Sequence, residues 1–274
     1  MFSEIFNNFN QNSIKIFNNF NRDYESKREE LIDFLYRTYK YLKLSDFTFF
    51  STIQILDKLF IGNKESFSIE NLYEIAIAAL YLSSKFNEKN IPKKKDILDS
   101  YYILNNKNYT NKFIDLYEIL ILKILDYKLN YTSVYDYIMF FFDNYQIFFY
   151  NYLSNKLFNK EKLLNLIKEN LLKFIKKFYK FNSLFLAIYL IKLSFQILYH
   201  NECNFVECIE KILKINIKNS EEFYLINKKF NEIKNEEILY KRNLILFNYQ
   251  QQQFQLMMLR QNLYKINLNN TTKM

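Results

Sequence analysis

Apolar residues recur along the chain at helical spacing, and in some stretches they occupy all sides of the helix rather than one face. The clearest stretch is 68–86, SIENLYEIAIAALYLSSKF, in which apolar positions fall on nearly every side. Such a helix is buried by neighbours on several sides. Ala76, Ala78 and Ala79 lie at its middle, where small side chains let other helices approach closely, and alanine itself favours helix. We therefore predict a central buried helix with Ser68 as its N-cap.

Four further stretches before residue 131 have helical patterns, so the first part of the chain predicts five helices. These stretches are 25–43, 47–60, 93–104 and 111–129. The last is again apolar on nearly every side, whereas we interpret the other three as amphipathic. We therefore expect 111–129 to be a second buried helix. Gly62, the only glycine, follows the stretch 47–60 and is a typical C-terminal stop.

From Thr132 the same rhythm of helices begins again. The stretches with helical patterns are 134–153, which holds one or two helices, 163–180, 183–198, 204–214 and 221–234. Residues 183–198 are apolar on all sides, and they stand third in their set, as 68–86 does in the first. This correspondence predicts a tandem repeat of one fold rather than two unrelated halves.

The predicted fold class is all-α, with two tandem five-helix folds. We place the first fold at 25–131 and the second at 132–235, between an N-terminal extension at 1–24 and a Gln- and Asn-rich tail at 236–274. The composition agrees, because sheets and tight turns consume glycine, whereas the 274 residues include one Gly and one Pro. Half of the residues are hydrophobic, which suffices for a sizeable core.

The composition also bears on location. Two cysteines indicate a reducing compartment without a disulfide framework. The first residues lack the basic start and compact apolar core of a signal peptide, and no stretch reaches about 18 uninterrupted apolar residues. We expect a soluble intracellular protein without membrane contact, in the nucleus, the cytoplasm or both.

The formal net charge of +9 comes from scattered lysines with two small clusters. The clusters are 93–95 and Lys173, Lys176, Lys177 and Lys180. We interpret them as solvated helix faces, while the sharper alternative is an acidic partner or nucleic acid. The sequence has no blocks of arginine and no glycines for a phosphate-binding loop, which argues against nucleic acid.

Candidate chemistry is sparse. The sequence has one histidine, no nucleophile elbow and no glycine-rich loop, so nothing fulfils the roles of a catalytic site. His200, Cys203 and Cys208 invite a metal, but three ligands without a fourth make a poor structural zinc site. Cysteines buried in a helical core are the expected alternative. We predict no enzymatic activity, no metal, no cofactor and no small-molecule substrate.

Four motifs, in order and at matching separations, resemble the cyclin box. They are Arg28–Leu35, similar to Arg-x-x-Leu-aliphatic-Asp-Trp-Leu; Leu56–Phe60, similar to Leu/Ile-Asp-Arg-Phe-Leu; Ala78–Glu88 with Pro92, similar to Ala-Ser-Lys-Tyr/Phe-Glu-Glu; and Tyr109–Thr110 with Tyr117–Tyr127, similar to the fifth cyclin-box helix. The resemblance covers residues 27–138, and the second half matches only in helical rhythm. It implies an N-terminal cyclin box at 25–131 and a C-terminal cyclin-like fold at 132–235.

The resemblance, closest to cell-cycle cyclins, implies a function. A cyclin is not an enzyme; it binds a cyclin-dependent protein kinase as a heterodimer and favours the active arrangement of the kinase. Carried over by position, Lys85 and Glu118 resemble the residues that bind the kinase, and Phe86 would pack beside them. Arg28 and Asp57 resemble the internal pair that ties the first helix to the second, which is a structural role.

The substrate-docking patch of cell-cycle cyclins is less well matched. Where the family has a Met before the Arg, a Trp and a Gln, this chain has Lys27, Phe34 and Tyr73. The candidate docking patch consists of Leu31, Phe34 and Tyr73. The resemblance therefore supports kinase binding better than the docking of Arg-x-Leu substrates.

Two other functions stay open. One is a structural subunit of a large assembly that keeps the fold and has lost the kinase; Asn87 in place of a Glu, and Glu74 in place of an aliphatic residue, motivate it. The other is a nucleic-acid-binding transcription protein of the same fold, motivated by the charge of +9, which predicts DNA binding with a steep salt dependence. The scattered lysines and the presence of Lys85 and Glu118 count against the second.

Overall fold

The structure, a computed structural model, describes residues 22–62, 71–105, 111–129, 131–144, 148–149, 159–177, 181–199, 205–213 and 215–236. The chain divides into two compact units, Met1–Ile226 and Asn227–Met274. Every regular element among the described residues is a helix, which confirms the all-α prediction. None of these helices is both long and apolar enough to cross a membrane.

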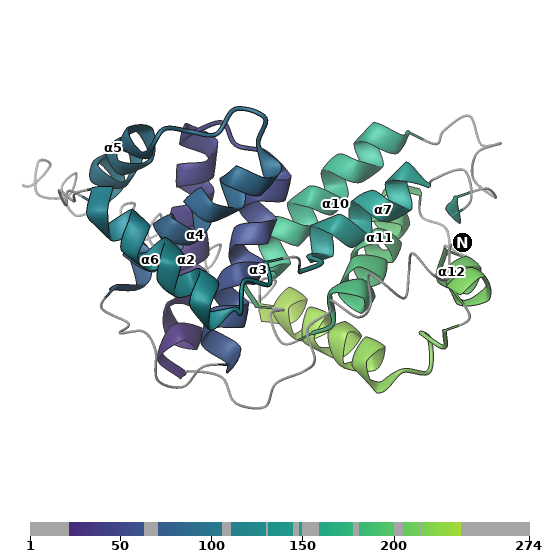
Figure 1. Ribbon diagram of the computed structural model, residues 1–274. Coiled ribbons are helices and arrows are strands. Elements are labelled where there is room, and N and C mark those ends of the chain that lie inside the picture. The colour runs from purple at the N-terminus through teal and green to yellow at the C-terminus, as the bar shows by residue number, and fades with distance from the viewer. Residues whose placement is uncertain are drawn as a thin grey trace, which may run out of the picture. The chain divides into compact units, whose positions relative to one another are not determined.

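In the first unit, α4 (Leu72–Asn87) is the helix around which the N-terminal part is built (Figure 1). It contacts α2 (Arg22–Tyr41), α3 (Asp46–Gly62), α5 (Lys94–Asn105) and α6 (Asn111–Ile124). Its middle, residues 75–80, has no exposed surface. The predicted central buried helix is therefore confirmed. The predicted cap, Ser68, lies outside the described residues; the helix begins at Leu72, and Asn71 before it makes no side-chain capping bond.

Helix α3, and not α6, is the second helix that is buried on most sides. Residues 52–57 of α3 are all buried. Among the described side chains of α6 only Ile114 and Ile121 are buried, whereas Leu116 and Ile119 expose 56% and 51% of their surface. The prediction of a buried helix at this place is therefore wrong. An apolar pattern shows which faces of a helix are stabilised by burial, but not whether other parts of the same chain cover those faces.

The first unit continues after α6 with helices that pack around α11. This helix (Ser183–Tyr199) contacts α7 (Val134–Asp143), α10 (Lys160–Phe174) and α12 (Phe205–Leu213). Residues 186–191 of α11 are buried, so the stretch predicted to be apolar on all sides is a buried helix. Residues 221–226 are helical at the end of the first unit, and residues 227–236 are helical in the second. The tandem repeat and the domain boundaries stay predictions.

Helix α7 begins with a capping box. The backbone N–H of Asp136 donates to Ser133 Oγ at 3.2 Å, and the backbone N–H of Ser133 donates to Asp136 Oδ2 at 2.6 Å. Two N–H groups that lack a partner inside the helix are satisfied in this way. Helix α7 also contacts α3, so it joins the N-terminal helices to the helices around α11.

Candidate functional site

The C-terminal end of α4 is anchored to the start of α3 by Glu88. Its Oε1 accepts hydrogen bonds from the backbone N–H of Ser45 at 2.7 Å, from the Ser45 hydroxyl at 2.8 Å and from the Thr48 hydroxyl at 2.5 Å. A carboxylate at a helix start satisfies N–H groups that have no intrahelical partner and interacts favourably with the helix dipole. Burial by itself raises the pKa of Glu88, but the hydrogen bonds from Thr48 and Ser45 outweigh it, and the pKa is lowered.

Lys85 and Glu118 meet between α4 and α6. The Nζ of Lys85 donates a hydrogen bond to Glu118 Oε1, and the two side chains form an ion pair. The side chain of Lys85 is 34% exposed and that of Glu118 is 12% exposed. Lys85 Nζ also lies 4.6 Å from the ring centroid of Tyr81, at a distance that gives a cation–π attraction. An ammonium group has three N–H donors, and Glu118 takes one of them.

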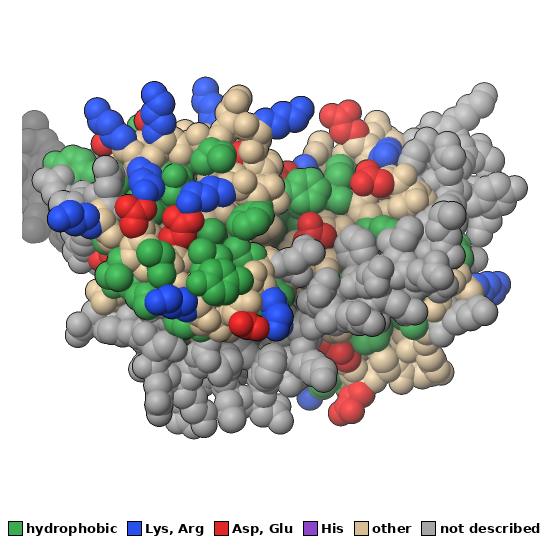
Figure 2. Space-filling view, in the orientation of Figure 1, with side chains coloured by type: hydrophobic (Ala, Val, Ile, Leu, Met, Phe, Trp, Pro, Cys, Tyr) green, Lys and Arg blue, Asp and Glu red, His purple; other side chains and the backbone are tan. Residues whose placement is uncertain are grey.

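Exposed apolar side chains lie on the same two helices as this ion pair. Phe86, which follows Lys85, exposes 68% of its surface, and Leu116 and Ile119 stand two residues before and one residue after Glu118 on α6. We call Lys85, Phe86, Leu116, Glu118 and Ile119 the α4–α6 surface. Figure 2 shows hydrophobic side chains on this face, with acidic and basic side chains among them. Exposed apolar patches rimmed by polar residues are typical of interaction sites.

A second ion pair joins α5 to α6 next to the same tyrosine. Lys94 Nζ pairs with Asp115 Oδ1 and lies 5.7 Å from the ring centroid of Tyr81. The hydrogen bond to Asp115 raises the pKa of Lys94. In the sequence, Lys94 belongs to the cluster 93–95, which we interpret as a solvated helix face, and Asp115 has no predicted role. The apolar pattern of 111–129 could have indicated an exposed apolar face on this helix, but from the sequence we interpret it as a second buried helix.

Arg28 and Asp57 form a buried, bidentate ion pair between α2 and α3. Arg28 Nε donates to Asp57 Oδ1 and Nη2 donates to Asp57 Oδ2, each at 2.7 Å. The Tyr24 hydroxyl also donates to Asp57 Oδ1, at 2.9 Å. Arg28 exposes 1% of its surface and Asp57 exposes 4%. Burial opposes the charge of Arg28, but the neighbouring Asp57 carboxylate dominates and raises the pKa of Arg28.

The same guanidinium reaches the end of α10. Arg28 Nη1 donates to the backbone carbonyl oxygens of Ile175 at 2.7 Å and of Lys176 at 2.9 Å. Carbonyl groups at a helix C-terminus lack intrahelical partners and carry partial negative charge, so they suit a buried cation. Arg28 therefore links α2 to α3 and also to the end of α10. The sequence predicted the first of these links but not the second.

The candidate docking patch is largely inside the molecule. Leu31 and Phe34 each expose 1% of their surface. Tyr73 is half-buried; its ring meets Phe34 edge-on at 5.1 Å, and its hydroxyl donates to Glu30 Oε1 at 2.6 Å. Burial and the bond to Glu30 raise the pKa of Tyr73 to about 12. Docking at Leu31 and Phe34 would require these side chains to move, and the patch stays a prediction.

The candidate metal ligands, His200, Cys203 and Cys208, are only partly described by the structure. Within the described residues, no three His, Cys, Asp or Glu side chains gather closely enough to hold a metal ion. His200 and Cys203 lie outside the described residues. Cys208, on α12, is half-buried, and burial raises the pKa of its thiol.

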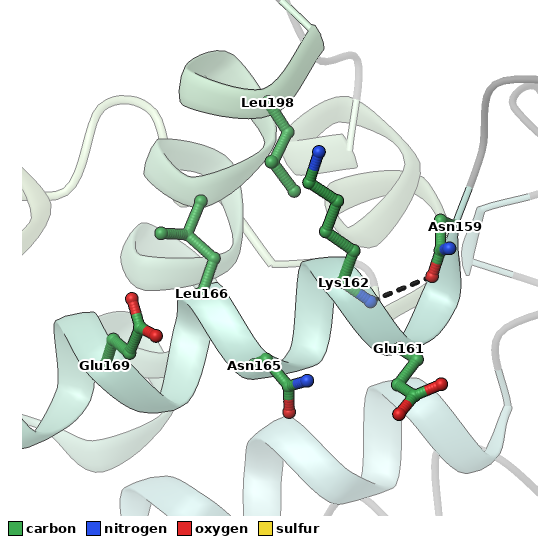
Figure 3. Close-up of a pocket in the computed structure, with 7 residues that line it drawn as sticks. All are labelled: Asn159, Glu161, Lys162, Asn165, Leu166, Glu169 and Leu198. Atoms are coloured by element: carbon green, nitrogen blue, oxygen red, sulfur yellow. Dashed lines mark hydrogen bonds between the residues drawn. The ribbon is translucent and has the colours of Figure 1, made fainter.

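One surface pocket lies away from all the predicted site residues. It has a volume of about 370 Å³ and is lined by Asn159, Glu161, Lys162, Asn165, Leu166, Glu169 and Leu198. In Figure 3, Lys162 and Leu166 extend from α10 toward Leu198 of α11, while Glu161 and Asn165 point away from it. The dashed bond, from the Lys162 backbone N–H to Asn159 Oδ1 at 2.9 Å, is the N-terminal cap of α10. We assign this pocket no function.

Comparisons with known proteins agree with the architecture. Residues 4–130 match the family model described as the cyclin N-terminal domain. A solved structure of a viral cyclin from herpesvirus saimiri is similar, with a TM-score of 0.59 and 14% sequence identity over 76% of this chain and 86% of that chain. At that identity the likeness shows the fold alone, and it extends beyond the residues matched by the family model. No curated protein matches the sequence.

Proposed function

Because this chain belongs to the cyclin-box family, we propose that it is a regulatory subunit that binds and activates a cyclin-dependent protein kinase. The observation that carries the proposal is the α4–α6 surface. It combines a half-exposed ion pair, Lys85 with Glu118, and the exposed apolar side chains of Phe86, Leu116 and Ile119. The protein would act in the nucleus, the cytoplasm or both, and the kinase would perform the catalysis.

Each component of this surface has a physical role in binding. Covering Phe86, Leu116 and Ile119 removes apolar area from water, which favours association. The remaining donors of Lys85 can bind backbone carbonyl groups of the partner, and the Glu118 carboxylate can accept N–H groups. Such charge-assisted bonds strengthen when the apolar rim excludes water, and they fix the register of the two proteins.

Activation would follow from differential binding. If the surface binds only the active arrangement of the kinase, association shifts the kinase population toward that arrangement. No group of the regulatory subunit then needs to touch the reacting atoms.

The test is affinity purification of the tagged protein from its own cells, followed by mass spectrometry and a kinase assay. We expect a stoichiometric kinase with activity in the eluate. Lys85→Ala together with Glu118→Ala should abolish its recovery. The matched control is Glu207→Ala with Lys218→Ala, which removes an exposed Lys–Glu ion pair of 2.6 Å outside the α4–α6 surface and should leave recovery unchanged.

Three outcomes would contradict the proposal in different ways. A double variant that recovers the kinase as the wild type does would show that the binding site lies elsewhere. A kinase-free eluate dominated by subunits of one large complex would favour the structural-subunit function. Recovery of DNA with a steep salt dependence would favour the transcription protein.

A further inference from the structure

A groove of about 880 Å³ opens where the end of α2 meets the segment between α4 and α5. Three lysines line it: Lys43 follows α2, and Lys89 and Lys93 lie between α4 and α5. Tyr41 and Ile91 line it as well, and they expose 56% and 50% of their surface. We call these five residues the α2–α5 groove. Its volume lies in the range of sites that bind a small molecule or a few residues of a peptide.

The three lysines of this groove carry charges that the chain itself does not use. All three are exposed, and no ion pair joins any of them to another described residue. By contrast, Lys85 and Lys94 nearby in the sequence are paired with Glu118 and Asp115. Figure 2 shows basic side chains along the edge of the molecule where α5 lies in Figure 1. The groove therefore presents ammonium groups that are available to another molecule.

The backbone of Lys43 is held in a left-handed conformation, with φ of 53°. Its N–H donates to the carbonyl oxygen of Lys40 at 3.2 Å, and the N–H of Leu44 donates to that of Tyr39 at 3.1 Å. These two hydrogen bonds end α2 in the manner of a Schellman motif, where glycine or asparagine is favoured. Lysine is thus not the residue that the turn itself prefers, and the two bonds fix the point from which its side chain extends.

Two of the three carboxylates beside these lysines already have partners. Glu88 accepts the hydrogen bonds at the start of α3, and Asp96 Oδ2, in the first turn of α5, accepts the Lys93 backbone N–H at 3.3 Å. The positive ends of the two helix dipoles offset part of both negative charges. The third carboxylate, Asp99, is exposed. Three ammonium groups and one carboxylate are therefore left to interact with another molecule, a balance that favours an anionic one.

The composition of the groove favours a peptide of another protein as its occupant. The two ends of this chain, 1–21 and 237–274, together contain two acidic and six basic residues, so neither supplies an acidic segment of its own. Carboxylates of a bound chain would form charge-assisted hydrogen bonds with the lysines. The exposed apolar area of Tyr41 and Ile91 would be covered by apolar side chains of the same segment. An acidic peptide with interspersed apolar residues supplies both groups.

We propose that the α2–α5 groove binds an acidic segment of a partner protein, in which aspartate or glutamate alternates with apolar residues. This goes beyond kinase binding at the α4–α6 surface, because it assigns a second site with its own chemistry. The lysine cluster 93–95, interpreted from the sequence as a solvated helix face, then divides its roles. Lys94 pairs with Asp115 inside the chain, whereas Lys93 binds the partner.

The test measures binding of labelled peptides to the purified full chain by fluorescence anisotropy. The probes are fluorescein-labelled nonapeptides in which glutamate stands at every second or third position among leucine and serine, each matched by a peptide with glutamine for glutamate. We expect at least one glutamate peptide to bind about tenfold or more tightly than its glutamine counterpart. The triple variant Lys43→Gln, Lys89→Gln, Lys93→Gln should lower that affinity by about tenfold or more, because the ammonium groups of the groove are lost.

A matched control separates the groove from the net charge of the protein. Lys160→Gln, Lys162→Gln and Lys211→Gln together remove the same charge from exposed positions of α10 and α12 outside the groove. At physiological salt they should leave the affinity within about twofold of the wild type, because distant surface charges are screened.

Two further variants test the apolar part of the groove and its independence from the kinase site. Tyr41→Ser with Ile91→Ser removes exposed apolar area and should lower the peptide affinity by about threefold or more. Lys85→Ala with Glu118→Ala should leave peptide binding intact, so that failure of this site and failure of kinase binding are distinguishable. Circular dichroism spectra that coincide with that of the wild type show that each variant is folded.

Three results with the peptides would overturn the proposal. They are equal affinity for the glutamate and glutamine peptides, equal losses in the groove variant and in the control variant, and no saturable binding of any glutamate peptide. A labelled DNA duplex adds a fourth. If the duplex binds more tightly than every glutamate peptide and loses affinity in the groove variant, the groove binds nucleic acid instead of an acidic peptide.

Discussion

Two pairs of opposite charge in this protein differ in almost every physical respect. Arg28 and Asp57 are nearly inaccessible, bidentate, and joined by further hydrogen bonds to a tyrosine hydroxyl and two backbone carbonyl groups. Lys85 and Glu118 share one hydrogen bond nearer the surface, and exposed apolar side chains lie on the same two helices. The first arrangement uses its charges within the chain, whereas the second leaves donors and apolar area for another molecule.

Burial separates a pair that stabilises the fold from a pair that is available to a partner. A buried charge whose donors and acceptors are all used stabilises the fold only as long as its partner is present. An exposed pair contributes little to the free energy of unfolding, because solvent screens it. Substitutions in the two pairs should therefore affect different measurements.

The largest expected effect is on the stability of the chain with Asp57→Ala. This change leaves the Arg28 guanidinium buried without its carboxylate, and we expect the free energy of unfolding to fall by about 3–5 kcal/mol. Urea denaturation of the purified chain measures it, with Asp99→Ala, at an exposed position, as the control. A loss below about 1 kcal/mol would be typical of an exposed pair and would contradict the structural role.

The next effect concerns the partly exposed pair, Lys85 with Glu118; the double variant removes both charges, so no unpaired buried charge is left behind. Lys85→Ala with Glu118→Ala should change the free energy of unfolding by no more than about 1 kcal/mol. The affinity for the co-purified kinase should fall by about 2–5 kcal/mol, because each protein then loses charge-assisted bonds inside the interface. Unfolding curves and titration calorimetry on the same preparations separate the two effects. A destabilisation as large as that of Asp57→Ala would place this pair among the structural ones.

The apolar rim should have a smaller effect of the same kind. Leu116→Ser with Ile119→Ser removes apolar area that only a partner covers, so we expect a loss of about 1–3 kcal/mol in kinase affinity. Stability should stay within about 0.5 kcal/mol, as for other exposed positions. Ile197→Ser, at a residue of α11 that is 48% exposed, is the matched control. If Leu116→Ser with Ile119→Ser and the control Ile197→Ser lower the kinase affinity equally, the α6 side chains are not part of the interface.

The smallest effect is a pH dependence at Glu88, which holds the end of α4 against α3. Its pKa in the folded chain lies below the usual value of 4.5, so its stabilisation is fully present above that pH and is lost as the pH falls through the folded pKa. Glu88→Gln should lower the free energy of unfolding by about 1 kcal/mol at neutral pH, and this difference from the wild type should shrink below pH 4.5. Unfolding curves at several pH values test this, and a difference that is independent of pH would contradict it.

The sequence alone correctly predicted the helical fold and the central, buried position of α4. Apolar residues on every side of α4 require cover on every side, and four neighbouring helices provide it. The same reasoning failed for α6, because an apolar face that stays exposed has the same sequence pattern as a face that the chain covers. Whether water reaches a given face of a helix depends on what the rest of the folded chain packs against that face.

The candidate site depended more on resemblance than on pattern. No spacing rule connects Lys85 with Glu118, which lie 33 positions apart, or Glu88 with Ser45, which lie 43 apart. The reach of Arg28 to the carbonyl groups of residues 175 and 176 spans an even longer separation and involves backbone atoms, which no residue type reveals. Contacts of this kind follow from packing and appear only once the fold is known.

The most direct measurement of the central claim is the affinity of the co-purified kinase for the wild type and for the Lys85→Ala, Glu118→Ala double variant, at equal amounts of folded protein. We predict a loss of about thirtyfold or more, equivalent to about 2 kcal/mol, with circular dichroism spectra that coincide. An unchanged affinity would contradict it, and the exposed ion pair and its apolar rim would then require another partner.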